Sequence, residues 1–128
     1  MNEVIKLLTR HRSIRKYADQ TVSEEQINEI IKSAQAAPSS IGGQQVTIIA
    51  IQVKQRKAKI AELAGGQPYI DKAPLFLLFC ADFNRASVAC EMNGQVMQSQ
   101  NCMVTTLVGS VDVGLSMGFA VAAAELMQ

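Results

Sequence analysis

The sequence has no tryptophan, one histidine and three cysteines, and none of its twelve lysine and arginine residues lies beyond Arg85. A single histidine and dispersed cysteines without a CxxC pair lack the ligand spacing of a metal site. An odd number of such cysteines also argues against a disulfide framework, so we expect reduced thiols, packed as small core residues, in a cytoplasmic protein. The net charge of +1 gives no indication of a nucleic-acid partner.

The longest apolar run, residues 103–127, has no basic residue near it. A run of this length can span a bilayer. However, Asp112 lies in its middle, alanine, glycine and serine outnumber leucine and isoleucine, and no flanking charge would set a topology. We therefore predict that no segment spans a membrane and that this run is a central helix buried in a core or against a second subunit. The first residues also lack the basic-then-apolar order of a signal peptide.

Positive charge is concentrated near the N-terminus, where residues 10–17 (RHRSIRKY) contain four of the twelve basic residues and the histidine. Arginine forks bind phosphate oxygens bidentately, and a serine hydroxyl and backbone N–H groups can satisfy the remaining oxygens. The cluster therefore suits one phosphate monoester. A solvated basic loop without a ligand is the alternative, and the residues alone leave both interpretations open.

Hydrophobic periodicity predicts alternating helices and strands. Ser23 and Gln26 form a capping box that begins a helix, and Pro38 ends it. Gly65 can supply the left-handed residue after a later helix. The expected helices are residues 4–8, 24–37, 54–64, 85–92 and 103–127, and the expected strands are residues 46–53 and 74–81.

The order of these elements and the chain length predict one domain, residues 1–128, with an α+β (α/β-like) fold. We expect a small mixed or antiparallel sheet flanked by helices. The strand at residues 46–53 is almost continuously apolar, which predicts that both of its faces are covered. Between the second helix and this strand, residues 38–44 (PSSIGGQ) form either a plain connection or a polar ledge that a ligand can approach closely.

Four segments, in this order and at this spacing, resemble the N-terminal half of the FMN-dependent nitroreductase family: residues 11–15 (HRSIR), Ser39-Ser40 with Gln44, residues 65–67 (GGQ) and residues 79–85 (FCADFNR). The likeness is greatest to its oxygen-insensitive NADPH nitroreductase and flavin reductase branch. It covers residues 1–85 well and the long final helix more loosely. The resemblance implies a nitroreductase-like fold and a homodimer that shares two FMN sites, with the long helix at the dimer interface.

The resemblance also implies roles for single residues. Residues matching the phosphate and ribityl contacts of FMN are His11, Arg12, Ser13 and Arg15. Those matching the loop over the flavin ring, typically from the partner subunit, are Ser39, Ser40 and Gln44. Gln67 matches a residue that hydrogen-bonds near the reactive edge of the ring. No catalytic side chain is implied, because the cofactor carries the chemistry.

By the same resemblance, NADPH or NADH reduces FMN, which then reduces a nitroaromatic, a quinone or a free flavin in a ping-pong cycle. One departure is that the sequence stops inside a helical pattern, whereas family members continue for about as long again. We therefore expect a domain that is incomplete at its C-terminus. Two alternatives remain: a dimerising module of the same fold that binds no flavin, and a regulatory domain that binds another phosphate.

Overall fold

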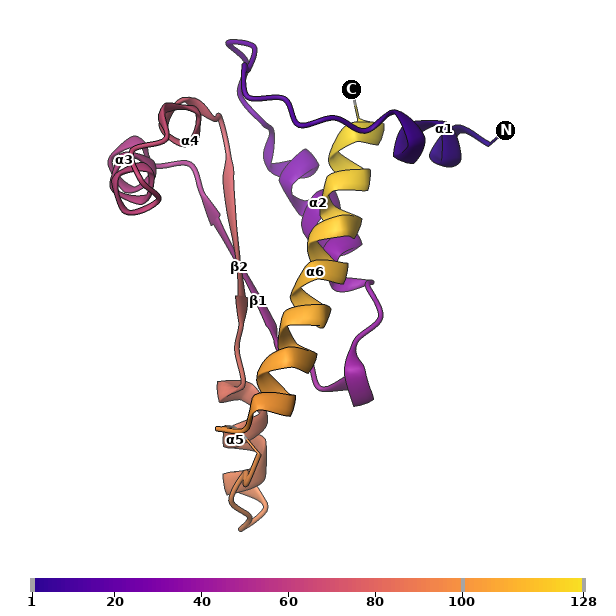
Figure 1. Ribbon diagram of the computed structural model, residues 1–128, viewed down its shortest axis with the longest axis vertical. Helices are drawn as coiled ribbons and strands as arrows, with labels where there is room; N and C mark the ends of the chain where they lie inside the picture. Colours follow the sequence, from indigo (N-terminus) through magenta and orange to yellow (C-terminus); the bar gives the residue numbers. More distant parts are fainter. Residues whose placement is uncertain (1, 100, 128) are drawn as a thin grey trace.

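The computed structural model describes residues 2–99 and 101–127, which form helices packed on a two-stranded sheet (Figure 1). The helices are α1 (Glu3–Arg10), α2 (Glu24–Gln35), α3 (Lys54–Leu63), α4 (Pro68–Lys72), α5 (Asn84–Met92) and α6 (Met103–Leu126). The strands are β1 (Val46–Ile51) and β2 (Phe76–Ala81), and a short 3₁₀ turn covers Ser40–Gly42. The predicted elements are therefore present, and α4, which lies in a segment expected to be loop, is an addition.

The helix ends follow the predicted capping chemistry. At the start of α2, the Ser23 hydroxyl accepts from the Gln26 N–H at 3.2 Å, and the Gln26 side chain accepts from the Ser23 N–H at 3.0 Å. After α3, Gly65 has a φ of +85°, which favours glycine. The Gly65 and Gly66 N–H groups donate to Glu62 and Ala61, which is a Schellman motif.

The sheet is antiparallel and is covered on one face within this chain. Ile48, Leu77 and Phe79 pack against a core of Ile30 and Ala34 from α2 and Ala120 from α6. On the opposite face the paired residues Ile49 and Leu78 are 44% and 38% exposed. The expectation that both faces of the first strand are covered is therefore wrong for the described chain. The reason is that α3 and α4 pack against one another beyond the end of the sheet rather than across it (Figure 1).

Helix α6 runs beside α2 and carries small residues where the two helices meet (Figure 1). Its buried residues are Gly109, Asp112, Ser116 and Ala120, at a spacing that places them on one face. Ser116 donates to the Ala34 carbonyl at 3.0 Å, so a polar side chain is satisfied inside the contact. By length and composition, α6 is the one helix among the described residues that could cross a membrane. Only one of its faces is buried in the chain, so burial of the other face against a second subunit stays a prediction.

Helix α3 buries a lysine, and one packing prediction, that of the cysteines, needs correction. In α3, Leu63 is 77% exposed, and the buried residues are Ala61 and Lys57, whose ammonium group donates to the Ala73 carbonyl. Among the cysteines, Cys80 and Cys90 are half-buried, whereas Cys102 is exposed just before α6. Cys102 is therefore not a core residue. Its place at a helix start exposes it to solvent.

Cys102 provides a pH-dependent prediction. The Thr105 hydroxyl, 3.4 Å from its sulfur, and the N–H groups of the first turn lower the pKa of the Cys102 thiol. A lowered pKa means more thiolate at neutral pH, so we expect Cys102 to be alkylated by iodoacetamide faster than Cys80 or Cys90. The alkylation rate of Cys102, plotted against pH, should have its midpoint below that of a free thiol. Thr105→Val should raise this midpoint. A midpoint unaffected by Thr105→Val would contradict this account.

Candidate functional site

The basic segment lines an open cleft of about 850 Å³, which we call the basic-loop cleft. The basic segment comprises residues 11–18, which form an extended chain between α1 and α2 and are all exposed. The far side is formed by Tyr69 of α4, Pro74, and Val121, Ala124 and Glu125 of α6. The structure therefore brings His11, Arg12, Ser13 and Arg15 together on one wall of this cleft.

Two of these side chains already have partners. Nδ1 of His11 lies 2.6 Å from Oε1 of Glu125, so the ring donates to this carboxylate and Nε2 remains to face a ligand. The Arg15 guanidinium lies over the Tyr69 ring, 5.4 Å from its centroid, in a cation–π contact. Both contacts hold the basic segment against α6 and α4.

The cleft is electropositive. Among its lining residues, Arg12, Arg15 and Lys16 are permanent cations, and Glu125 is the one carboxylate. Within residues 2–99 and 101–127, no carboxylate lies within ion-pair distance of Arg12 or Arg15. Guanidinium groups without a protein partner, beside the Ser13 hydroxyl, are suited to a doubly charged phosphate monoester.

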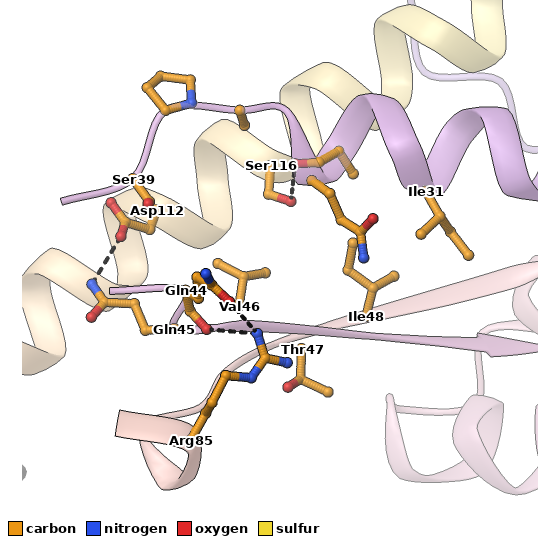
Figure 2. A pocket seen from close by; sticks show the side chains of 14 residues that line it. Ile31, Ser39, Gln44, Gln45, Val46, Thr47, Ile48, Arg85, Asp112 and Ser116 are labelled. Atoms are coloured by element: carbon orange, nitrogen blue, oxygen red, sulfur yellow. Dashed lines mark hydrogen bonds between the residues drawn. The ribbon is translucent and has the colours of Figure 1, made fainter. Parts of the chain in front are cut away.

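Residues 38–44, which we call the serine loop, line a second cleft of about 400 Å³. This serine-loop cleft lies between α2, β1 and α6 (Figure 2). Ser39 and Gln44 line it, together with Gln45, Arg85 and Asp112. Ser40 does not line it, but the Ser40 N–H donates to both oxygens of Asp112 at 3.1 and 3.2 Å. The serine loop therefore faces a cavity at both of its ends.

Arg85 fixes the side chain of Gln44. One guanidinium nitrogen donates to Oε1 of Gln44 at 3.1 Å (Figure 2). Because arginine can only donate, the amide must present its oxygen to Arg85, and its NH₂ group is left to donate elsewhere. Gln44 itself has a φ of +48°, a left-handed conformation that a non-glycine residue adopts at a cost.

The two clefts do not share a residue. Asp112 lines one and Glu125 lines the other, and residues this far apart on one α-helix are separated by about 20 Å along its axis. The basic residues and the serine loop of one chain therefore do not meet. Gln67 lies in neither cleft. It precedes α4 and donates to the Ala64 carbonyl at 3.2 Å, two residues before the Tyr69 that contacts Arg15.

Sequence reasoning missed five residues of these clefts. In the sequence, Asp112 argues only against a membrane helix, and Arg85 is only part of a matched segment. Glu125, Tyr69 and Gln45 carried no signal, because their roles depend on contacts between distant segments. A lone acidic residue in the middle of an apolar helix was the one usable sign, since a buried charge requires partners.

The comparison with known families decides the relationship, because a model described as "Nitroreductase family" matches residues 8–126. The chain belongs to the nitroreductase family. Nitroreductase relatives include an FMN reductase [NAD(P)H] of Bacillus subtilis, 60% identical over 126 residues, an alignment covering 98% of this chain and 51% of that protein. The oxygen-insensitive NADPH nitroreductase of Salmonella typhimurium is 35% identical over 125 residues, with coverage of 98% and 50%.

Solved structures agree with the nitroreductase assignment. The structure of Bacillus megaterium NfrA2 matches with a TM-score of 0.97 and 53% identity, covering 99% of this chain and 52% of that one. The NADPH:FMN oxidoreductase from Vibrio harveyi complexed with NAD⁺ matches with a TM-score of 0.90 and 34% identity, covering 98% and 53%. The predicted fold class is thus confirmed as that of nitroreductases. The chain spans about half the length of the relatives it matches.

Proposed function

We propose that this chain belongs to an FMN-dependent NAD(P)H oxidoreductase that acts on nitroaromatics, quinones or free flavins. The names of the relatives support the cofactor and the electron donor. The observation that carries the proposal is the basic-loop cleft, in which Arg12 and Arg15 have no carboxylate partner among the described residues. Within this proposal, residues 1–128 supply part of one FMN-binding domain of a cytoplasmic enzyme.

The donors in the basic-loop cleft fit FMN. Its phosphate monoester is a dianion, and two guanidinium groups with the Ser13 hydroxyl match its charge and its oxygens. Nε2 of His11 adds a group for the phosphate or the ribityl chain, held in place by the bond from Nδ1 to Glu125. Gln67 would contact the ring near its reactive edge. We assign these residues to binding and orientation, and none to proton transfer.

The serine loop would complete the site from a second copy of the chain. Since the two clefts lie far apart on α6, Ser39, Ser40 and Gln44 of one protomer cannot cover a ligand held by its own basic segment. We therefore infer a homodimer with two shared sites. The NH₂ group of Gln44, left free by Arg85, is the donor that this loop offers.

Bound FMN supplies hydride transfer from NADPH or NADH to the acceptor, in a ping-pong cycle through one pocket. The contribution of the chain is to bind the phosphate and to place hydrogen-bond donors around the ring. Donors fixed before reaction stabilise developing negative charge without reorganisation.

The visible spectrum of the purified protein and its oxidation of NADPH test the proposal. We expect a yellow protein with flavin absorbance bands and NADPH consumption that depends on an added quinone. A colourless protein of the same fold that does not take up FMN would favour the dimerising module. Stabilisation by other phosphate compounds but not by FMN would favour the regulatory domain.

A further inference from the structure

Asp112 is a buried carboxylate in the middle of an apolar helix, with only 4% of its surface exposed. Burying a charge is unfavourable unless it is paired or hydrogen-bonded. Within the described residues no cation lies within ion-pair distance of Asp112. One partner is the Ser40 N–H, at 3.1 and 3.2 Å from its two oxygens. The other is Nε2 of Gln45, at 2.8 Å, which Figure 2 shows.

These two partners stand at either end of the strained part of the serine loop. Between them, Ile41 and Gln44 have φ angles of +51° and +48°. Left-handed conformations at non-glycine residues persist only where the surroundings hold them, and they concentrate at ligand-binding sites. Ile41 is 98% exposed, so its own packing does not hold it there. Arg85 bonds to Gln44 at one end of the loop, whereas Asp112 bonds to both ends.

The far end of the loop is held from two directions. The Gln45 side chain bonds to Asp112, and the Gln45 carbonyl accepts from the Asp82 N–H at 2.9 Å at the edge of the sheet. Gln45 is only 7% exposed, and its side chain crosses the space beneath Gly43, where an added Cβ would lie 2.9 Å from Oε1. The position of Gln44, one residue earlier, therefore depends on a side chain that Asp112 fixes.

We propose that Asp112 is a positioning residue for the flavin-facing serine loop, acting through the Ser40 N–H and the Gln45 amide. This inference rests on the proposed function for the identity of the ligand, but the loop anchor itself does not. The carboxylate lines the serine-loop cleft, where its oxygens accept from these two partners, and it touches no ligand in this assignment. Its effect reaches the cofactor through the backbone at residue 40 and through the neighbour of Gln44.

Comparison of Asp112→Ala with Asp112→Asn tests the anchor. Alanine leaves both donors without an acceptor. Asparagine can accept from the Ser40 N–H through Oδ1. It can also donate to Oε1 of Gln45 once the Gln45 side-chain amide has rotated by about 180°. Since a buried donor left without an acceptor destabilises the structure that holds it, we expect Asp112→Ala to speed amide exchange at Ser40 by at least about tenfold. We also expect FMN, added without other ligands, to bind Asp112→Ala at least about tenfold more weakly than wild type. Asp112→Asn should stay within about threefold of wild type both in FMN affinity and in amide exchange at Ser40.

Ser33→Ala is the matched control, because it removes the Ser33 hydroxyl bond to the Phe119 carbonyl between α2 and α6 without touching the loop. Both readouts should stay at the wild-type level in this variant. Amide exchange in β1, measured in the same samples, separates a local loss from general unfolding. If Asp112→Ala does not fold, Gln45→Ala takes its place. We then expect smaller changes in the same direction, that is, faster amide exchange at Ser40 and weaker FMN binding.

Unchanged exchange at Ser40 in Asp112→Ala, or in Gln45→Ala if that variant replaces it, would overturn the anchor. An Asp112→Asn variant as defective as Asp112→Ala would also do so, because charge rather than position would then matter. A wild-type protein that binds no FMN would defeat the proposed function instead, and the exchange measurement would still decide the role of Asp112.

Discussion

The double variant Arg12→Ala with Arg15→Ala is expected to bind FMN at least about a hundredfold more weakly than wild type, because each guanidinium lost removes a charge-assisted hydrogen bond worth about 1.5–3 kcal/mol. Neither arginine has a carboxylate partner within the described residues, so its removal leaves no protein charge unpaired. The loss should therefore appear in binding rather than in folding. Titration of the apoprotein with FMN, followed by quenching of flavin fluorescence, measures it.

Arg56→Ala is the control, since Arg56 is an exposed base on α3 outside both clefts. It should leave the affinity unchanged. Replacement of Arg12 and Arg15 by lysine keeps the charge but loses the bidentate fork, so an intermediate affinity is expected. Flavin occupancy unchanged in the alanine variant would defeat the assignment of the phosphate site to this segment.

Local chemistry predicted the elements of this fold well. The capping box at Ser23 and Gln26 and the left-handed Gly65 were predictable because they depend on a few neighbouring residues. The antiparallel pairing of β1 and β2 was one of two options that the sequence left open. Helix α4, which the hydrophobic periodicity does not predict, is short and begins at Pro68, a residue common in turns as well as at helix starts.

Burial was predicted less well, because it depends on what covers each surface. The apolar strand β1 buries Ile51 but leaves Ile49, on the same face, 44% exposed, and the apolar helix α6 buries one face and exposes the other within the chain. Composition shows that a segment is apolar but not which neighbour will cover it. The same limit explains the candidate site. The phosphate-binding chemistry of residues 11–15 was apparent from the sequence, whereas the contacts of Asp112 and Glu125 join residues more than sixty positions apart.

The exposed face of α6 is the basis of a second prediction, which concerns the assembly of two chains into a dimer. Val104, Leu107, Val111 and Leu115 recur at helical spacing and are 40–67% exposed, on a face turned away from the buried residues of the same helix. Contiguous exposed apolar surface of this kind marks an interaction site. Within the proposed shared-site dimer, this face is the one we assign to the second copy.

Leu107→Glu with Val111→Glu should convert the dimer to a monomer, because two carboxylates without partners would have to be buried at the interface. We expect the dimer dissociation constant to rise by at least about a hundredfold, measured by sedimentation equilibrium. Leu63→Glu, which places one glutamate on an exposed leucine of α3, should have no effect on the dimer. A double variant that remains dimeric would remove α6 from the interface. FMN binding should be lost together with the dimer, since each site needs the serine loop of the other protomer.

Mixing two defective variants tests the shared site directly. The Arg12→Ala/Arg15→Ala protein lacks the phosphate wall, and a Gln44→Ala protein lacks the donor of the serine loop, so each homodimer has two damaged sites. In a two-fold symmetric dimer, a heterodimer of the two collects both defects in one site and leaves the other intact. Random exchange of protomers makes half of the dimers hybrid, so about a quarter of all sites should regain wild-type affinity. If each site were built from a single chain, mixing would restore none of them, because no protomer in the mixture carries both an intact basic segment and an intact serine loop.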